Sequence, residues 1–265
     1  MTQRNPDLTL ALQMADAADQ VTMSHYLTDD LQVETKPDQS PVTEADRACE
    51  QLLRQRLETL RPEDGQWGEE FGQQGTADRR WIIDPIDGTK NYLRGVPVWA
   101  TLIGLQDGED FPVGVVSAPA LRRRWWASTG GGAFTQDPDG RVRQLQVSGV
   151  RNVEDASFSY SDEDYWRERG AATGLRRLIQ SCWRTRAYGD FLSHVLVAEG
   201  AVDIAAEPAL FPWDMAALIP IVTQSGGTIT GYDGGPALER GCAVTTNTHL
   251  HADVLSMLQS PADAL

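Results

Sequence analysis

The chain has 265 residues, of which 41% are hydrophobic and 23% are charged, a composition typical of a globular protein with a substantial core. Its formal net charge of -15 excludes nucleic acid as an expected partner, because the phosphate backbone would be repelled. The N-terminus lacks the pattern of a secretion signal, and no apolar stretch reaches membrane-spanning length. We therefore expect a cytoplasmic protein without nucleic-acid or membrane partners.

The cysteine content also favours a cytoplasmic protein. Cys49, Cys182 and Cys242 are odd in number, widely spaced and form no C-x-x-C pair. Cysteines with this distribution are typical of free thiols in a reducing environment.

Two helices separated by a polar loop are expected at the N-terminus. The first begins at Pro6, and its apolar positions recur at helical spacing. These positions are Leu8, Leu12, Ala15, Ala18 and Val21. The second helix begins near Thr43, because Thr43 and Asp46 have the spacing of a capping box. The intervening residues 28–41 are predicted to form a mobile loop.

Residues 67–127 are predicted to form strands joined by tight turns. Strands are expected at 96–105, 113–118 and 124–128, as an antiparallel meander with a turn at Asp107-Gly108. The glycine triplet at 130–132 is compatible with a phosphate-binding loop or a hairpin turn. The hairpin turn is favoured because no helical pattern follows the triplet.

A soft boundary is expected near Ser148, after a turn at 137–140, where the pattern changes to βα units. Beyond it the predicted strands are 156–161, 183–186, 201–206, 228–230 and 243–246, and the predicted helices are 175–180, 191–199 and 213–225. We therefore expect a layered α/β (α+β) fold in one domain of two halves, 1–148 and 149–265.

The segment 81–91, with the sequence WIIDPIDGTKN, is the main candidate site. Its apolar run predicts the end of a buried strand, which Pro85 is expected to break between the carboxylates of Asp84 and Asp87. Gly88 is free to adopt unusual backbone angles, and Thr89 is an expected helix N-cap. Carboxylates and free backbone N–H groups at one point suit a divalent cation and a phosphate.

Two further acidic motifs decide between a metal site and an ordinary turn capped by aspartates. They are Gly68-Glu69-Glu70 upstream and Trp213-Asp214 downstream. Both favour the metal site. The combined ligand set consists of oxygen donors alone, which suits Mg²⁺ and not Zn²⁺. Its members are Glu69, Asp84, the carbonyl of Ile86, Asp87 and Asp214.

Together the three motifs resemble the inositol monophosphatase family over nearly the whole chain. The resemblance implies an αβαβα sandwich of the inositol monophosphatase and fructose-1,6-bisphosphatase type. It also implies a Mg²⁺-dependent phosphate monoester hydrolase with two or three Mg²⁺ ions per site, a small-molecule phosphate monoester as substrate, and a homodimer. The D-x-x-D spacing differs from the D-x-D-x-T of phosphatases that form an aspartyl-phosphate, so a covalent route is disfavoured.

The resemblance also implies the metal ligands. Glu69, Asp84 and the Ile86 carbonyl would hold one ion. Asp84 would be shared with a second ion, which Asp87 and Asp214 would also hold.

Catalytic and phosphate-binding roles follow from the same resemblance. Glu69 and Thr89, beside Asp84, would orient the attacking water, and the backbone N–H groups of Gly88 and Thr89 would bind the phosphate. Asp46 is either a ligand or neighbour of a weaker third metal, or only the capping partner of Thr43.

The segments 94–103, 119–127 and 183–191 resemble the histidinol-phosphate phosphatase branch of the family, which acts in histidine biosynthesis. Inositol-specific members carry small residues after the glycine matching Gly189, whereas this chain carries Asp190. Glu207 matches the family's contact to a substrate hydroxyl. Negative charge at Asp190 and Glu207 would favour the ammonium and imidazole of histidinol phosphate over a neutral polyol. The expected substrate-binding residues are Asp87, Lys90, Asn91, Gly189, Asp190, Glu207 and Asp214.

Alternatives remain for residues and for function. Asp190 also has the position of an N-cap, and Glu207 that of a surface acid. Rival functions are an inositol-1-phosphate or broad-specificity phosphatase and, from another class, a regulatory protein-binding member of the family. A sugar-bisphosphate or nucleotide phosphatase would need more basic residues near the motif than Lys90 and Arg94.

Overall fold

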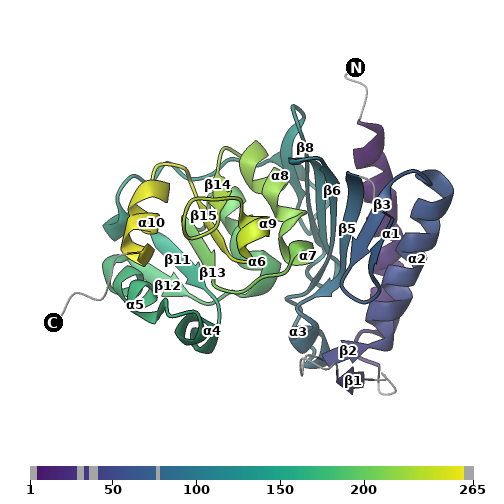
Figure 1. Cartoon of the computed structure of the whole chain (residues 1–265), viewed down its shortest axis with the longest axis horizontal. Coiled ribbons are helices and arrows are strands. Elements are labelled where there is room, and N and C mark those ends of the chain that lie inside the picture. Colours follow the sequence, from purple (N-terminus) through teal and green to yellow (C-terminus); the bar gives the residue numbers. More distant parts are fainter. Residues whose placement is uncertain (1–4, 29–32, 36–40, 76–77, 260–265) are drawn as a thin grey trace.

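A computed structural model describes residues 5–28, 33–35, 41–75 and 78–259 (Figure 1). The helices are α1 (Pro6–His25), α2 (Glu44–Leu60), α3 (Thr89–Leu93), α4 (Glu163–Glu168), α5 (Ala172–Ser181), α6 (Asp190–Ala198), α7 (Pro212–Met215), α8 (Leu218–Gln224), α9 (Ala237–Arg240) and α10 (His251–Gln259). The strands are β1 (Val33–Thr35), β2 (Pro41–Thr43), β3 (Gly65–Gly68), β4 (Gly72–Gln74), β5 (Arg79–Asp87), β6 (Ala100–Asp107), β7 (Asp110–Ala118), β8 (Arg123–Ser128), β9 (Gly132–Gln136), β10 (Val142–Gln144), β11 (Ser157–Tyr160), β12 (Arg184–Arg186), β13 (Ile204–Glu207), β14 (Thr228–Thr230) and β15 (Ala243–Thr246).

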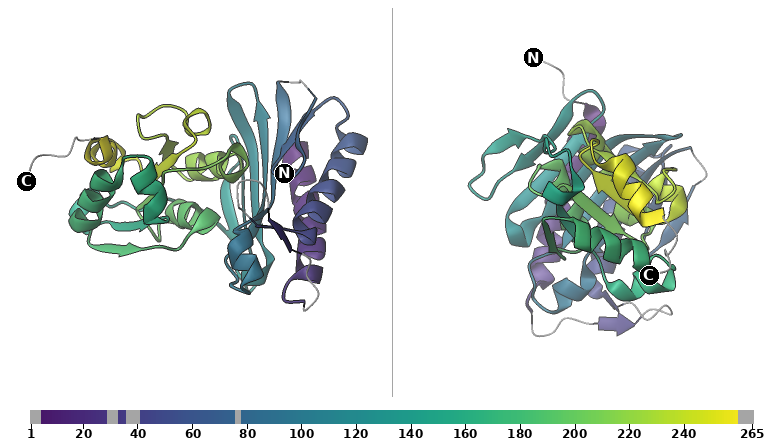
Figure 2. Two further views of the ribbon diagram at one scale, coloured as in Figure 1. Left: turned by 60° about the horizontal axis from the view of Figure 1, so that its bottom comes forward. Right: turned by 90° about the vertical axis from the view of Figure 1, so that its left-hand side faces the viewer.

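The described elements stack in five layers (Figures 1 and 2). Helices α1 and α2 cover one face of an eight-stranded sheet, and α6, α7 and α8 separate that sheet from a five-stranded one. Helices α4, α5 and α10 form the outer layer on the far side of the second sheet. The αβαβα sandwich expected from the sequence is therefore confirmed.

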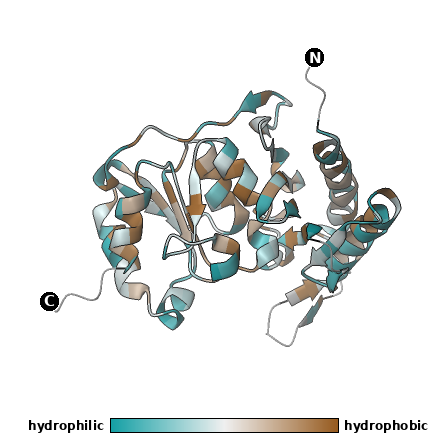
Figure 3. Cartoon of the chain, turned by 45° about the horizontal axis from the view of Figure 1, so that its top comes forward, coloured by the Kyte–Doolittle hydropathy of each residue, from teal (hydrophilic) through white to brown (hydrophobic). Residues whose placement is uncertain are grey.

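Strand alternation in the eight-stranded sheet separates two cores. The sheet has the order β10-β9-β8-β7-β6-β5-β3-β4. In β6, Ile103 and Leu105 pack towards α1 and α2, whereas Ala100 and Leu102 pack towards α6 and α8. Successive side chains of a strand point to opposite faces, so both faces are apolar because helices cover both. Helix α8 in the middle layer carries mostly hydrophobic residues (Figure 3).

The five-stranded sheet has the order β12-β11-β13-β15-β14. Strands β12, β11 and β13 run parallel, whereas β15 pairs antiparallel with both β13 and β14. All strands of this sheet follow residue 148, and all strands of the eight-stranded sheet precede it.

Two local predictions are confirmed by the hydrogen bonds. Thr43 and Asp46 form both halves of the capping box of α2. Residues 129–131 form the hairpin turn between β8 and β9, and Gly132 is the first residue of β9, so the glycine triplet belongs to a hairpin.

Several predicted boundaries are wrong, and the strand predicted at 201–206 begins only at Ile204 as β13. Within the segment predicted as a loop at 28–41, β1 and β2 pair antiparallel, and the predicted mobility falls largely on 29–32 and 36–40, outside the described residues. The strand predicted at 96–105 begins only at Ala100 as β6, because Val96 is 41% exposed and the chain from Gly95 to Trp99 is still turning out of α3. The apolar, β-branched composition of 96–99 therefore misled the prediction.

The helix predicted at 213–225 is two helices, α7 and α8, interrupted at Ala216 and Ala217. Pro220 lacks the N–H that would bond the carbonyl of Ala216. The break lies directly on the sheet: a Cβ added to Gly104 would approach Ala216 to 2.7 Å, and one added to Gly114 would approach the Ala217 carbonyl to 2.1 Å. Two glycines thus allow the middle layer to contact the sheet backbone.

Gly114→Ala should therefore destabilise the fold by about 1–3 kcal/mol, the usual cost of overpacking. The measurement is the free energy of unfolding in urea. Gly149→Ala is the matched control, because a Cβ at Gly149 meets nothing within 4 Å. Equal stability of the two variants would contradict the close approach.

The described residues bear on two other expectations. No helix among them has the length and hydrophobicity needed to span a lipid bilayer. Cys49, Cys182 and Cys242 are free thiols, two buried and one half-buried.

Candidate active site

A β-bulge places the two aspartates of the main motif on one face of the sheet. Residues three apart in a regular strand point to opposite faces. Here Asp84 pairs with Leu102 and Asp87 pairs with Ala100, so three steps along β5 oppose two along β6. The extra residue turns both carboxylates towards the middle layer. The strand is therefore not broken at Pro85, as predicted, but continues through it with a bulge.

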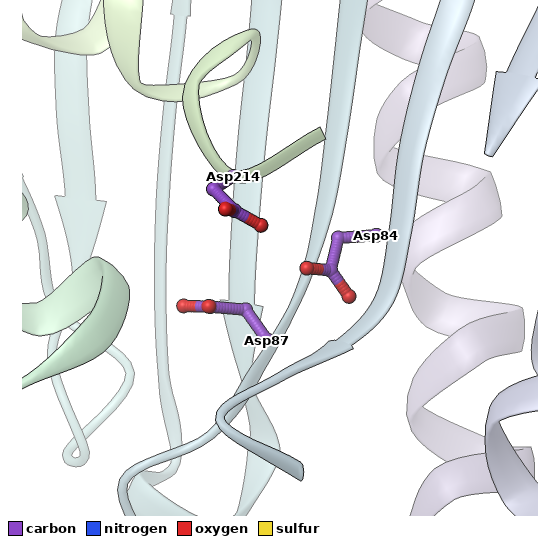
Figure 4. Close-up of side chains that lie close together, drawn as sticks. All are labelled: Asp84, Asp87 and Asp214. Carbon is purple, nitrogen blue, oxygen red and sulfur yellow. The ribbon is translucent and has the colours of Figure 1, made fainter. Parts of the chain in front are cut away.

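Helix α7, which packs on β5 and β6, brings Asp214 to the same point (Figure 4). One oxygen from each of Asp84, Asp87 and Asp214 can be chosen so that all three lie within 4.8 Å of one another. Asp214 also caps its own helix, because its Oδ2 accepts the Phe211 N–H at 2.7 Å. The capping role and the site role thus coexist.

Burial and mutual repulsion raise the pKa values of these acids. Loss of solvation is the largest cause for Asp84 and Asp87, followed by the charges of neighbouring acids, and both pKa values lie well above the usual range. The same causes raise the pKa of Asp214 to about 7. Such a cluster is unfavourable as three bare anions, so it favours protons or a cation.

Glu69 enters the site from the turn between β3 and β4. It lines one cavity of about 440 Å³ together with Asp87, Thr89 and Asp214. After burial, the charge of Glu69 is among the causes that raise the pKa values of Asp84 and Asp214.

Asp46, Thr89 and Ile86 are connected by hydrogen bonds. The Thr89 hydroxyl lies 3.0 Å from the Ile86 carbonyl and 3.5 Å from Asp46 Oδ1. Asp46 Oδ2 accepts the N–H of Thr43 at 2.8 Å and its hydroxyl at 2.6 Å. Asp46 is therefore both the capping partner expected from sequence and a neighbour of the site.

Gly88, not Thr89, is the N-cap of α3, with φ of +85°. A Cβ there would lie 2.9 Å from the Val98 carbonyl, so both backbone angle and space require glycine. Gly88, Thr89 and Lys90 line the cavity. Asn91, predicted to contact substrate, lines the cavity. Its Nδ2 donates to the Val98 carbonyl at 2.9 Å and to Asp190 Oδ2 at 2.8 Å, so it also holds the Asp190 side chain.

Asp190 faces the cavity and does not cap α6. The N-cap is Gly189, and the Asp190 side chain bonds Asn91 instead. Asp190 has a left-handed φ of +48°, and the next residue, Phe191, donates its N–H to Asp87 Oδ2 at 2.7 Å. Burial and the nearby Glu207 raise the pKa of Asp190 to about 7, while Lys90 acts in the opposite direction.

Glu207 is 7% exposed and lines the cavity, which contradicts the surface-acid alternative. His194, which no sequence motif indicated, lies behind it: His194 Nε2 is 3.5 Å from Glu207 Oε1, and Nδ1 is 2.8 Å from Thr245 Oγ1. The one available signal was its place four residues after Asp190, on the same face of α6. The cavity wall also includes Tyr160, Ser161, Asp162 and Tyr165, which the sequence did not single out.

The donor set fits a hard divalent cation. All candidate ligands are oxygen atoms, and their charges would be neutralised by positive charge at that point. The sandwich and its carboxylate cluster thus define a class, the metal-dependent phosphomonoesterases.

Within that class, the chain belongs to the inositol monophosphatase family, whose sequence profile matches residues 3–261. A histidinol-phosphatase of Streptomyces coelicolor is 54% identical over 95% of this chain and 96% of its own length. A histidinol-phosphatase of Mycobacterium tuberculosis is 52% identical over 96% and 98% of the two chains. An inositol-1-monophosphatase of Rhizobium meliloti is 33% identical over 87% of each.

Solved structures agree with the fold. The extragenic suppressor protein suhB of Bartonella henselae superposes with a TM-score of 0.87 at 28% identity, covering 97% of this chain and 99% of that one. An IMPase of Thermotoga maritima gives a TM-score of 0.84 at 28% identity, covering 96% and 97%. The family membership inferred from the three motifs is thus confirmed.

The raised pKa values predict how stability depends on pH. An aspartate whose folded-state pKa exceeds its unfolded value binds a proton on folding, so its contribution is lost as pH rises from the unfolded pKa through the folded one. For Asp190 and Asp214 that window runs from about 4 to about 7. Metal-free protein should therefore have a lower Tm at about pH 8 than at about pH 6.

Added Mg²⁺ should raise the Tm more at about pH 8, because cation and protons compete for the same oxygens. Differential scanning fluorimetry with chelator or with Mg²⁺ measures both effects. Asp214→Asn is the control variant, because it removes one of the titrating acids. Its Tm should therefore depend less on pH than that of wild type, whereas an effect of general surface charge would be the same in both proteins. A Mg²⁺-induced increase in Tm of the same size at both pH values would contradict the assignment of these aspartates to the cation site.

Proposed function

We propose that the chain is a Mg²⁺-dependent histidinol-phosphate phosphatase that hydrolyses L-histidinol phosphate to L-histidinol and phosphate in histidine biosynthesis. The observation that carries the proposal is the pair of acids, Asp190 and Glu207, in the wall of the cavity that Asp87 and Asp214 of the carboxylate cluster also line. The names of the relatives that are 52% and 54% identical support the same substrate.

We assign the metal ligands as the sequence suggested. Glu69, Asp84 and the Ile86 carbonyl would hold one Mg²⁺, and Asp87 and Asp214 a second that shares Asp84, with Asp46 bordering a weaker third. When bound, Mg²⁺ neutralises the carboxylates and stabilises the charge that develops on the phosphoryl oxygens and the leaving alkoxide.

The side chains around the phosphate would position water and ester for in-line attack. Thr89 keeps its hydroxyl between the Ile86 carbonyl and Asp46, which leaves its oxygen as an acceptor for a water proton. Glu69, on the facing turn, would hold the same water from the other side. The backbone N–H groups of Gly88 and Thr89 would bind the phosphate.

The far wall would recognise the organic part of the substrate. Histidinol phosphate carries an ammonium and an imidazole, and buried carboxylates at Asp190 and Glu207 suit charge-assisted hydrogen bonds to such groups. Their crowding supports this: Glu207 raises the pKa of Asp190, and a bound cation would relieve that repulsion. Lys90, at the rim, would face the phosphate side.

The test is phosphate release from L-histidinol phosphate and from inositol 1-phosphate, each with Mg²⁺ and with chelator. Hydrogen bonds to charged groups contribute about 1.5–3 kcal/mol, so kcat/KM for histidinol phosphate should be at least about tenfold higher. Chelation should abolish both activities. Equal values would favour the inositol or broad-specificity alternative, and inactivity on both would refute the proposal and favour the regulatory one.

Other parts of the proposal concern organisation. We propose one phosphatase domain of two halves, 1–148 with the GEE and DPIDGT motifs and 149–265 with the WD motif and substrate pocket. The homodimer and the cytoplasmic location inferred from the sequence remain predictions.

A further inference from the structure

A buried side chain of α2 holds the turn that carries Glu69. Glu50 is fully buried, and its Oε2 accepts the backbone N–H of Glu70 at 2.7 Å. Its Oε1 accepts the N–H of Phe71 at 3.3 Å. Both donors follow Glu69 directly in the chain. The carboxylate therefore fixes the backbone immediately after the candidate metal ligand.

Arg54, one helical turn further along α2, holds the other end of the turn. Its Nε donates to Glu50 Oε1 at 2.7 Å, and its Nη2 donates to the Gly72 carbonyl. A buried ion pair offsets its desolvation only when further hydrogen bonds satisfy both partners. Here the backbone of the turn supplies them. We call the Glu50–Arg54 pair the clamp.

Gly68 makes room for the clamp. A Cβ built on Gly68 would lie 2.0 Å from Glu50 Oε1 and 2.3 Å from Glu50 Cδ. Gly68 lies in strand β3 and is absent from the glycines with positive φ, so its backbone angles do not require glycine. What requires glycine is the close approach of the carboxylate. The glycine of the GEE motif is thus explained by a residue 18 positions earlier in the chain.

We propose that Glu50, supported by Arg54, is a positioning residue that fixes the β3–β4 turn so that Glu69 is presented to the metal site. The inference rests on the metal-dependent function proposed above. The Glu69 N–H donates to the Ile83 carbonyl at 3.3 Å, which ties the start of the turn to β5. The clamp holds the residues that follow Glu69, against the repulsion between Glu69 and the acids Asp84 and Asp214. The clamp opposes that repulsion from the layer on the other side of the sheet.

A measurement of metal affinity distinguishes this positioning role from a purely structural one. Loss of any buried ion pair lowers stability, but only loss of the clamp should weaken metal affinity in protein that is still folded. The matched control is Glu199→Gln, because the Glu199 side chain is only 6% exposed and pairs with Arg123 at 2.8 Å and with Arg143, but it does not line the cavity.

The experiment is Mn²⁺ binding by isothermal titration calorimetry without substrate, with circular dichroism and Tm to establish folding. Glu50→Gln can accept one backbone N–H but turns an amide donor towards a second donor, so its Kd for Mn²⁺ should rise at least about tenfold. Glu199→Gln should lower the Tm while changing the Kd by less than about twofold. Wild-type affinity in folded Glu50→Gln overturns the proposal.

Arg54→Lys decides the matter should Glu50→Gln fail to fold. Lysine keeps the charge beside Glu50. Its single nitrogen cannot reproduce the fixed geometry in which two guanidinium nitrogens donate to Glu50 and to the Gly72 carbonyl. A Kd for Mn²⁺ raised about threefold or more supports the clamp, and an unchanged Kd overturns it. Because binding is measured without turnover, wild-type protein that binds Mn²⁺ but hydrolyses neither test substrate would refute the proposed function and not the clamp.

Discussion

Asp87→Asn is expected to reduce kcat/KM for histidinol phosphate by more than about 100-fold, while the protein remains folded. Changes behind metal ligands already cost about 10–100-fold, and Asp87 is assigned as a ligand itself. Asparagine has the same shape and keeps an oxygen that can accept the Phe191 N–H, now bonded at 2.7 Å. The substitution therefore removes the charge and leaves the docking of α6 in place.

The same substitution should stabilise the metal-free protein. Burial and neighbouring charges raise the pKa of Asp87, so a neutral group there removes repulsion. A loss of activity with a raised Tm in chelator is the combined signature, measured by phosphate release and by thermal unfolding. Damage to the fold would lower both.

Asp203→Asn is the matched control for Asp87→Asn. Asp203 is likewise a buried aspartate, 6% exposed, and accepts the Ser157 N–H at 2.7 Å, but it does not line the cavity. Its substitution should lower stability and leave kcat/KM within about threefold of wild type. Full activity of Asp87→Asn would refute the metal assignment.

The sequence predicted the clustering of Asp84, Asp87 and Asp214 better than the course of the strand that carries the first two. The spacing of Asp84 and Asp87 indicated two carboxylates at one strand end, but Pro85 was interpreted as a break. A proline lacking its N–H is tolerated at a bulge as well as at a strand end. Only the pairing of Asp87 with Ala100 distinguishes a bulge from a strand end. Strand pairing depends on residues far along the chain, so the local sequence does not reveal it.

The pocket wall was predictable only where a motif marked it. Asp190 and Glu207 followed from positions relative to Gly189 and Asp214. Tyr160 in β11 and Tyr165 in α4, by contrast, line the cavity only because the folded chain brings these two elements to its wall. No local pattern records that proximity, and the same holds for the approach of Glu50 to Gly68.

Asp190→Asn is expected to lower kcat/KM for histidinol phosphate about 10–100-fold and to leave inositol 1-phosphate hydrolysis nearly unchanged. The range corresponds to the loss of one hydrogen bond to a charged group. Asparagine suits the site for two reasons. It tolerates the left-handed φ of +48°, and it can still accept from Asn91 Nδ2, now at 2.8 Å. The loss of charge is then the main change.

The neutral substrate separates recognition of the cation from damage to the site, since both esters use the same carboxylate cluster. Asp190 raises the pKa of Asp87, so its neutralisation should, if anything, assist metal binding, and the Mg²⁺ dependence measures this. Glu207→Gln should act in the same direction. The two effects should be non-additive in the double variant, because the acids interact and would share one cation. Equal losses on both esters would show that Asp190 serves the metal site, and a variant with undiminished preference for histidinol phosphate would require the cation to bind elsewhere in the cavity.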